Sequence, residues 1–234
     1  WKAWTLAIFP AYHSRNMVGN LWNNWLAGIA NPKYYTWAGR IQRGEEVTFI
    51  DGLGKRWDTK AIQEEMRRLG VMDKGQFGSD IFREIDAKLR HGRFDQLGRE
   101  NWLVTKGFKV GQAIENNARI AHFTAKLAEG YTPQEAALSV KKYLFDYSEL
   151  TDFEKNVMKR LFPFYAWTRK NIPLQLEHLV TNPAKFSVVY KGRKAVEDDT
   201  QSPNEKFLPQ WVIENYPTRI RFNKDKNTYE YFLA

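Results

Sequence analysis

The spacing of apolar and polar positions predicts a mainly helical chain. The clearest pattern covers 16–30 (NMVGNLWNNWLAGIA), where apolar residues recur at i, i+3 and i+4 and predict an amphipathic helix that Pro32 would end. The opposite face carries only asparagines: Asn16, Asn20, Asn23 and Asn24. Because Lys and Glu form helices better than Asn, such a face favours close contact with backbone or polar groups over solvent.

Start and stop signals predict further helices. Thr132, Pro133 and Glu135 combine an N-cap, a proline at the first position and an acid at the third, and Thr151 with Glu154 forms a second capping box. The helix from Thr151 should break or kink at Pro163. The predicted helices cover 58–69, 79–91, 100–129, 133–144, 151–162, 164–180 and 183–196.

The remaining stretches predict loops and a little β-structure. Residues 31–57 predict a loop, with a short strand at 47–50 and a turn at 52–55, where GLGK lacks the spacing of a phosphate loop. Residues 71–80 are Gly-rich and predict a mobile connection, and 218–232 alternate as a β-hairpin does. We therefore expect a mainly α, irregular multi-helix domain with a small C-terminal β-hairpin.

Composition suggests two parts within a much larger polypeptide. We expect a Trp-rich N-terminal helical part at 1–130 and a basic helical part at 131–234 that includes the terminal hairpin. The chain opens on Trp1 without an initiator Met, which suggests that it is one segment of something longer. The absence of Cys excludes disulfides and thiolate metal sites, and no run approaches the about 20 apolar residues of a membrane-spanning helix.

The net charge of +9 is concentrated in two places. Residues 1–44 hold five basic and no acidic residues, and residues 141–194 hold eleven basic against five acidic ones. Charge of one sign gathered in this way favours a polyanion, either nucleic acid or anionic lipid. Solubility, or contact with acidic neighbouring subunits, explains it equally well.

No pattern of residues predicts a catalytic or metal site. None of the four histidines, His13, His91, His122 and His178, has another at i+3 or i+4, so no helix face presents a metal-binding pair. No serine-nucleophile motif is present, and no pair of carboxylates is singled out for acid–base work. We expect no enzyme activity, no cofactor, no metal and no small-molecule substrate.

The features that favour a binding function are stronger than those that favour catalysis. Five of the nine tryptophans fall within the first 37 residues, and Trp suits surfaces with one apolar and one wet side. A protein interface is favoured over an anionic bilayer, because interfacial helices carry Lys or Arg where this one carries Asn. The candidate partner-binding residues are Trp22, Trp25, Asn20 and Asn24. The candidate DNA or lipid contacts are Arg169, Lys170, Lys191, Arg193 and Lys194.

Two stretches of the chain carry long motifs of polar, aromatic and proline residues. The first reads PAYHSRN at 10–16, followed by Gly19-Asn20. The second comprises FDYS at 145–148, Thr151, FE at 153–154, PFY at 163–165, RKN at 169–171 and Pro173. Both resemble large polyvalent protein-associated domain 38, an α-helical domain found toward the C-terminal end of very large phage polyvalent and internal virion (ejection) proteins. The similarity runs from about residue 10 to 196, except for 45–95.

The resemblance implies a bacteriophage virion protein of the head or tail interior that can be delivered into the host during genome delivery. It implies contacts with other virion proteins and with copies of itself, with phage DNA and the host membrane surface as further partners. It brings no catalytic residues. The alternative is a nucleic-acid-binding accessory domain of a large phage-encoded multi-domain enzyme such as a virion polymerase.

The first motif also suggests a polar cluster of His13, Arg15 and Asn16 that pins the start of the first helix against a neighbouring helix. We expect Arg15 to contact Asp146 or Glu154.

Overall fold

A computed structural model describes most of the chain in two compact units, residues 1–174 and 175–234. The described residues are 10–72, 98–146, 150–151, 153–158, 161, 165–198, 218–223 and 228–232. They confirm a mainly helical fold with small two-stranded antiparallel sheets. The predicted helix at 79–91, the break at Pro163 and positions 73–80 of the predicted connection lie outside this set.

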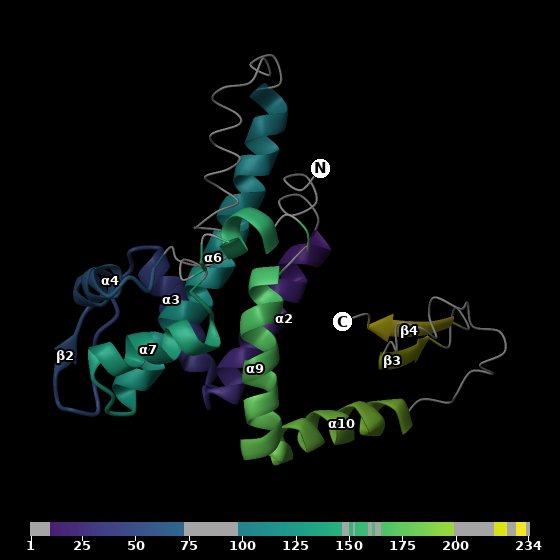
Figure 1. The fold of residues 1–234 in the computed structure, drawn as a ribbon. Coiled ribbons are helices and arrows are strands. Elements are labelled where there is room, and N and C mark those ends of the chain that lie inside the picture. The colour runs from purple at the N-terminus through teal and green to yellow at the C-terminus, as the bar shows by residue number, and fades with distance from the viewer. Residues whose placement is uncertain are drawn as a thin grey trace. The chain divides into compact units, whose positions relative to one another are not determined.

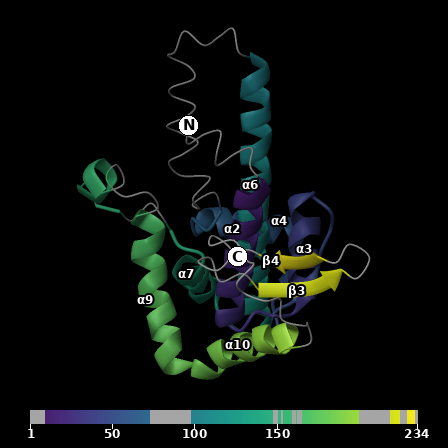
Figure 2. The same cartoon turned by 90° about the vertical axis from the view of Figure 1, so that its right-hand side faces the viewer.

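The first unit is built around α6 (Gly98–Ala128), which packs against α2 (Pro10–Leu26), α3 (Pro32–Gln42) and α7 (Pro133–Tyr143). In two perpendicular views α6 runs alongside α2 and continues beyond α3, α4 and α7 at its N-terminal end (Figures 1 and 2). This long helix was predicted within two residues at each end. Its buried side chains form one core with those of the helices around it, and the largest are Trp57, Phe123, Ile41, Ile62, Met66, Ile120 and Leu127.

The prediction of a loop at 31–57 is wrong for Pro32–Gln42, which form helix α3. Asn31 is its N-cap and accepts a hydrogen bond from the Lys33 N–H, and Pro32 occupies the first turn. Proline is favoured there because its missing N–H would be unsatisfied in any case. Pro32 therefore begins α3, while α2 ends earlier, at Leu26, and begins at Pro10 rather than near 16.

Strands β1 (Phe49–Ile50) and β2 (Arg56–Trp57) pair antiparallel and lead into α4 (Thr59–Arg68), whose N-cap is Asp58. The predicted turn between them is confirmed. Asp51 accepts hydrogen bonds from the backbone N–H groups of Leu53 and Lys55, and its other oxygen accepts from Trp57 Nε1 at 2.7 Å.

Helix α7 begins with the predicted capping box of Thr132 and Glu135. It ends at a buried cation, because the fully buried Arg119 of α6 donates to the carbonyls of Leu144 and Phe145 at 2.5 and 2.7 Å. Phe145 adopts φ +47°, a left-handed conformation that side-chain-bearing residues rarely occupy. The Arg119 guanidinium thus holds the chain in an unfavourable turn as it leaves α7.

Beyond that turn a second, smaller apolar cluster forms from Phe145, Leu150, Ala166 and Leu174. The predicted Thr151–Glu154 capping box is present and opens a π-helical turn, η4 (Glu154–Met158). Helix α9 (Tyr165–Thr181) follows.

The second unit contains the end of α9, α10 (Pro183–Asp198) and the strands β3 (Thr218–Asn223) and β4 (Thr228–Phe232), which pair antiparallel. Helix α10 contacts β3. Residues 224–227, between the two strands of the predicted hairpin, lie outside the described residues.

The two compact units divide the chain at 174/175. Helix α7 belongs to the first core, where Ala136, Ala137 and Val140 pack with the buried residues of α3, α4 and α6.

Candidate interaction surfaces

Helix α2 faces the core with its asparagines and the solvent with part of its apolar stripe. Asn23 and Asn24 are buried, whereas Met17, Val18 and Leu21 are 44%, 44% and 41% exposed. The sequence correctly indicated that the asparagine face meets backbone and polar groups. Those groups belong to this chain, so Asn24, predicted to bind a partner, is not available for one.

The asparagines of α2 enter a buried polar network. Asn23 donates to the carbonyl of Tyr143, and Asn24 donates to the carbonyl of Ala118 and to the Tyr35 hydroxyl. The Oδ1 of Asn24 lies 2.8 Å from Nδ1 of the fully buried His122. These bonds satisfy polar atoms inside the core, which would otherwise be costly.

The exposed apolar side of α2 forms one wall of an open groove of about 440 Å³ between α2, α3 and α6. Its apolar lining is Met17, Leu21, Val110, Ala113, Ile114 and Ala118. Its other lining residues are Asn20, Tyr35, Gly39, Gln42, Arg43 and Asn117. The sequence did not predict this groove, because 31–57 was interpreted as loop; Asn31-Pro32, an N-cap followed by proline, was the available signal.

The groove wall contributed by α3 is held by hydrogen bonds. The Asn117 side chain donates to the Tyr35 carbonyl, and the Tyr35 hydroxyl accepts from Asn24. Burial raises the pKa of Tyr35, partly offset by that hydrogen bond from Asn24. Tyr35 therefore connects the groove to the buried network and fixes the position of its wall.

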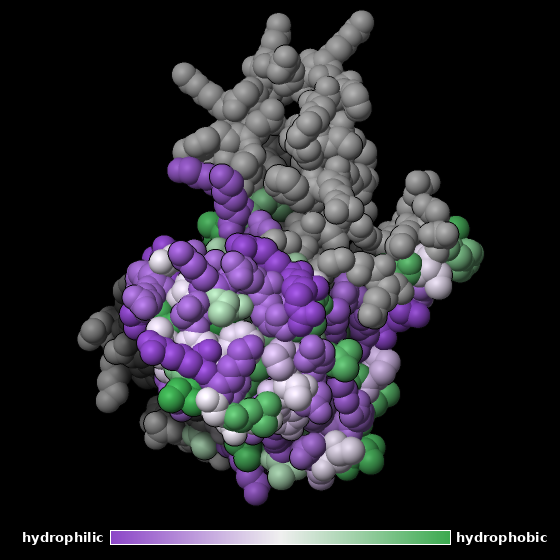
Figure 3. Space-filling view, turned by 90° about the vertical axis from the view of Figure 1, so that its left-hand side faces the viewer, coloured by the Kyte–Doolittle hydropathy of each residue, from purple (hydrophilic) through white to green (hydrophobic). Residues whose placement is uncertain are grey.

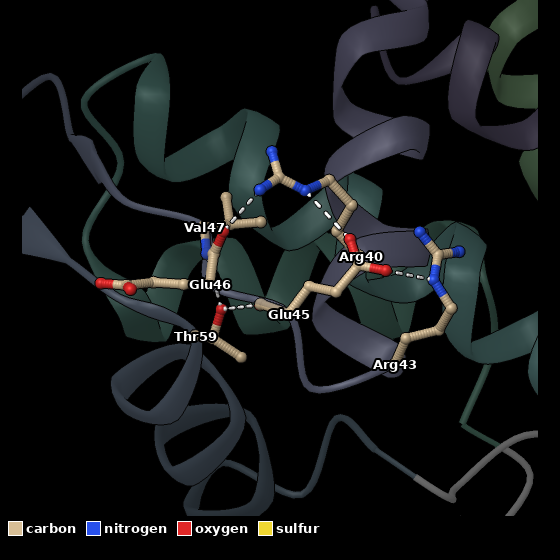
Figure 4. A network of polar contacts seen from close by, with 6 residues as sticks. All are labelled: Arg40, Arg43, Glu45, Glu46, Val47 and Thr59. Carbon is tan, nitrogen blue, oxygen red and sulfur yellow. Dashed lines mark hydrogen bonds and ion pairs between the residues drawn. The ribbon is translucent and has the colours of Figure 1, made fainter.

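The C-terminal end of α3, where Gln42 and Arg43 line the groove, carries a set of ion pairs (Figure 4). Glu45 accepts from Arg40 at 3.2 Å and from Arg43 at 2.6 Å, and Arg40 also donates to the Glu46 carbonyl. The Glu45 carbonyl in turn accepts from the Thr59 hydroxyl, which accepts from the Val47 N–H. This set of contacts fixes the loop that leaves α3 and the Arg43 side chain in the groove.

Another face of the first unit differs in character. Over α4, β2 and α7 hydrophilic side chains predominate, and hydrophobic ones occur singly or in small groups (Figure 3). Scattered apolar residues of this kind are ordinary on protein surfaces, whereas a lined apolar groove is not.

Trp22 and Trp25 are half-buried and contact each other, with ring centroids 5.2 Å apart. Asn20 is also half-buried and lines the groove. Of the four residues predicted to bind a partner, Asn20 is therefore the one that reaches this groove.

The predicted polar cluster at the start of α2 is divided. His13 is buried and Asn16 is half-buried, while Arg15 is exposed. Burial raises the pKa of Tyr12, and the charge of Glu115 on α6 adds to this shift. The first turn of α2 therefore lies beside α6.

The expected contact of Arg15 with Asp146 or Glu154 is wrong. Glu154 accepts from Thr151 and Tyr165 and pairs with Arg169, whose Nε lies 2.5 Å from the carboxylate. Arg15 points into solvent, and no ion pair or hydrogen bond joins it to another described residue.

The predicted DNA or lipid contacts lie on two helices. Arg169 is exposed and Lys170 half-buried on α9 in the first unit. Lys191 and Lys194 are exposed and Arg193 half-buried on α10 in the second unit. Helix α10 also exposes Val188, Val189 and Tyr190.

No group of three or more His, Asp or Glu able to hold a metal ion occurs in the part of the chain that the structure describes. Among those same residues, no helix is both long and apolar enough to cross a membrane. Comparison of the chain with protein-family models, curated proteins and solved structures gave no match.

Proposed function

We propose that this chain is a non-enzymatic interaction segment of a bacteriophage virion protein, an internal or ejection protein of the head or tail interior. It would act through contacts with other virion proteins during genome delivery, as an irregular multi-helix domain with a C-terminal β-hairpin. The phage context rests on the resemblance of residues 10–20 and 145–173 to large polyvalent protein-associated domain 38.

One observation carries the interaction function: the open apolar groove between α2, α3 and α6. Met17, Leu21 and Val110 leave between 41% and 51% of their surface in water although a core lies next to them. Apolar groups lined up on a concave surface mark binding sites for proteins or ligands. The hydrogen bonds behind the groove keep it open without a partner, so little ordering is needed on binding.

The proposal can be tested in phage particles. A photo-crosslinking amino acid would replace Leu21 or Val110 in the full-length protein, with the exposed Glu64 of α4 as a matched control position. We expect the protein in purified particles, and crosslinks to another virion protein from Leu21 and Val110 but not from Glu64. Absence of the protein from purified particles would contradict the virion assignment, and uncrosslinked groove positions would contradict the interaction surface.

A second candidate function, a nucleic-acid-binding accessory domain of a large phage enzyme, is favoured by α10. Lys191 and Lys194 are exposed there, with Lys185 and Arg193 half-buried on the same helix. Phosphate contacts release counterions, so DNA affinity should fall steeply as salt rises. Double replacement of Lys191 and Lys194 by Gln should weaken binding for all sequences alike. Affinity that does not respond to salt or to this variant would exclude the candidate.

A further inference from the structure

The geometry points to an amphipathic α-helix with acidic flanks, supplied by a partner protein, as the occupant of the groove between α2, α3 and α6. This inference rests on the proposed interaction function and adds the chemistry of the partner.

The shape of the groove fits a helix. Its walls are three helices, and its lining is aliphatic on two of them: Met17 and Leu21 on α2, and Val110 and Ile114 on α6. A helix that binds in a groove presents apolar residues at i, i+3, i+4 and i+7 and buries them between such walls. A flat bilayer cannot reach into a concave surface, and DNA phosphates gain nothing from an aliphatic lining. A helix from a partner protein fits both the concave shape of the groove and its aliphatic lining.

The charges of the helices that line the groove favour one sign of charge at the flanks of the partner helix. Arg15 on α2, Arg40 on α3 and Lys109 on α6 are exposed. The groove itself contains Arg43, 63% exposed although Glu45 holds its Nε. Among the described side chains of α2, α3 and α6, the only acid is Glu115, which is buried and paired with Arg119. Glu45 pairs with both Arg40 and Arg43, so its one carboxylate offsets only one of these two cations, and the helices that line the groove keep a net positive charge. That charge favours acidic residues on the partner and opposes basic ones.

A substitution at Gly39 can fill the groove without disturbing the fold. A Cβ built there would lie 3.5 Å from the Arg43 guanidinium and 3.7 Å from the Asn117 amide, ordinary contacts with two groove-lining side chains. The fold therefore does not require glycine at this helical position, where glycine is less stable than alanine by about 1 kcal/mol. Its absent side chain leaves room inside the groove, and a larger residue would fill that room.

The test uses synthetic helical peptides of about 15 residues, or four turns. One carries Leu at i, i+3, i+4 and i+7 with Glu on both flanks, the second has Lys in place of Glu, and the third has Ser in place of Leu. Binding to the full chain would be followed by fluorescence anisotropy. We expect the Glu-flanked peptide to bind at least about tenfold more tightly than either of the others, equivalent to about 1.4 kcal/mol.

Variants of the chain locate the binding. Leu21→Ser and Val110→Ser should each weaken binding of the Glu-flanked peptide severalfold, and Gly39→Leu should abolish it while leaving the urea midpoint unchanged or higher. Arg43→Gln should narrow the preference for Glu over Lys flanks, whereas Arg67→Gln on α4 should not. Far-UV circular dichroism confirms that each variant is folded.

Equal affinity for the Glu- and Lys-flanked peptides, no binding of either, or binding unaffected by Leu21→Ser and Val110→Ser would overturn the inference. Binding of anionic vesicles or DNA that these two variants abolish would also overturn it. Crosslinks in particles from Leu21 to a partner segment without acidic flanks would leave the proposed function standing and remove only this inference.

Discussion

Asn24 and His122 form a buried pair whose protonation the surrounding bonds define. The Asn24 amide nitrogen donates to the Ala118 carbonyl, so its Oδ1 is the acceptor for His122 Nδ1–H at 2.8 Å. The other imidazole nitrogen then accepts from the Ser139 hydroxyl, also at 2.8 Å. These bonds hold the imidazole in the tautomer that carries its proton on Nδ1.

This pair predicts a pH dependence of stability. Burial, with the nearby charges of Lys126 and Arg119, lowers the pKa of His122 to about 3 from its ordinary value near 6.5. Below pH 6.5 the unfolded chain takes up a proton here and the folded chain does not. The free energy of unfolding should thus fall as pH drops toward 3, by up to about 1.4 kcal/mol per pH unit from this group.

Urea unfolding of the full chain at pH 7, 6 and 5 measures this slope above the range in which carboxylates titrate. The variant His122→Gln, although less stable at pH 7, should show a shallower slope. Identical slopes for the two proteins would mean that His122 is accessible to protons in the folded chain.

The orientation of α2 predicts an unusual contrast between two substitutions. Asn24→Leu inserts an apolar residue of similar size but leaves the Ala118 carbonyl, the Tyr35 hydroxyl and His122 without their partner, which should cost about 2 kcal/mol or more. Leu21→Asn replaces a residue that is 41% exposed and should change stability by less than about 1 kcal/mol. Chemical denaturation of both variants checks the order, and the reverse order would show that the stripe of Leu21 faces the core.

Replacement of the buried cation Arg119 should cause a large loss of stability. Arg119→Met removes the ion pair with Glu115 and the hydrogen bonds to the Leu144 and Phe145 carbonyls in the core, so the free energy of unfolding should fall by about 3 kcal/mol or more. The matched control is Arg68→Met, which removes the exposed ion pair with Glu65 and should have little effect. Thermal unfolding compares the two; equal small effects would mean that Arg119 is dispensable.

Substitution by alanine should have opposite effects on stability at Gly52 and at Gly19. A Cβ on Gly52 would lie 2.5 Å from the backbone nitrogen of Gly130, so Gly52→Ala must displace the β1–β2 turn from the end of α6 and should cost about 1–3 kcal/mol. A Cβ on Gly19 meets nothing within 4 Å, and Gly19→Ala in α2 should stabilise by about 0.5–1 kcal/mol. Urea midpoints that shift in the same direction would contradict this packing.

Local signals in the sequence located the helices well where caps were explicit. Thr132–Glu135, Asp58 and Pro183 each mark a helix start that the structure confirms, because caps act within one turn. The orientation of α2 was only half predictable. Its asparagine face correctly indicated contact with polar groups, but nothing local to α2 indicates that Tyr143 and Ala118, more than 90 positions away in sequence, supply them.

Neither the groove nor the hydrogen bonds of Arg119 to the end of α7 could be predicted from the sequence, because both depend on residues distant along the chain. Arg119 lies in an ordinary helical pattern, and its role depends on where α7 ends, at Leu144 and Phe145. Phe145 itself has no glycine-like signal, since its left-handed backbone is imposed by contacts distant in sequence.

Arg119 also joins two apolar clusters that share no core residue. Its own neighbours belong to the cluster around Phe123 and Ile120, and one of the carbonyls it holds belongs to Phe145, which anchors the cluster with Leu150, Ala166 and Leu174. Neither cluster can lose its packing without disturbing this guanidinium. The first unit should accordingly melt as one cooperative block, with tryptophan fluorescence and amide exchange at Leu174 following a single transition.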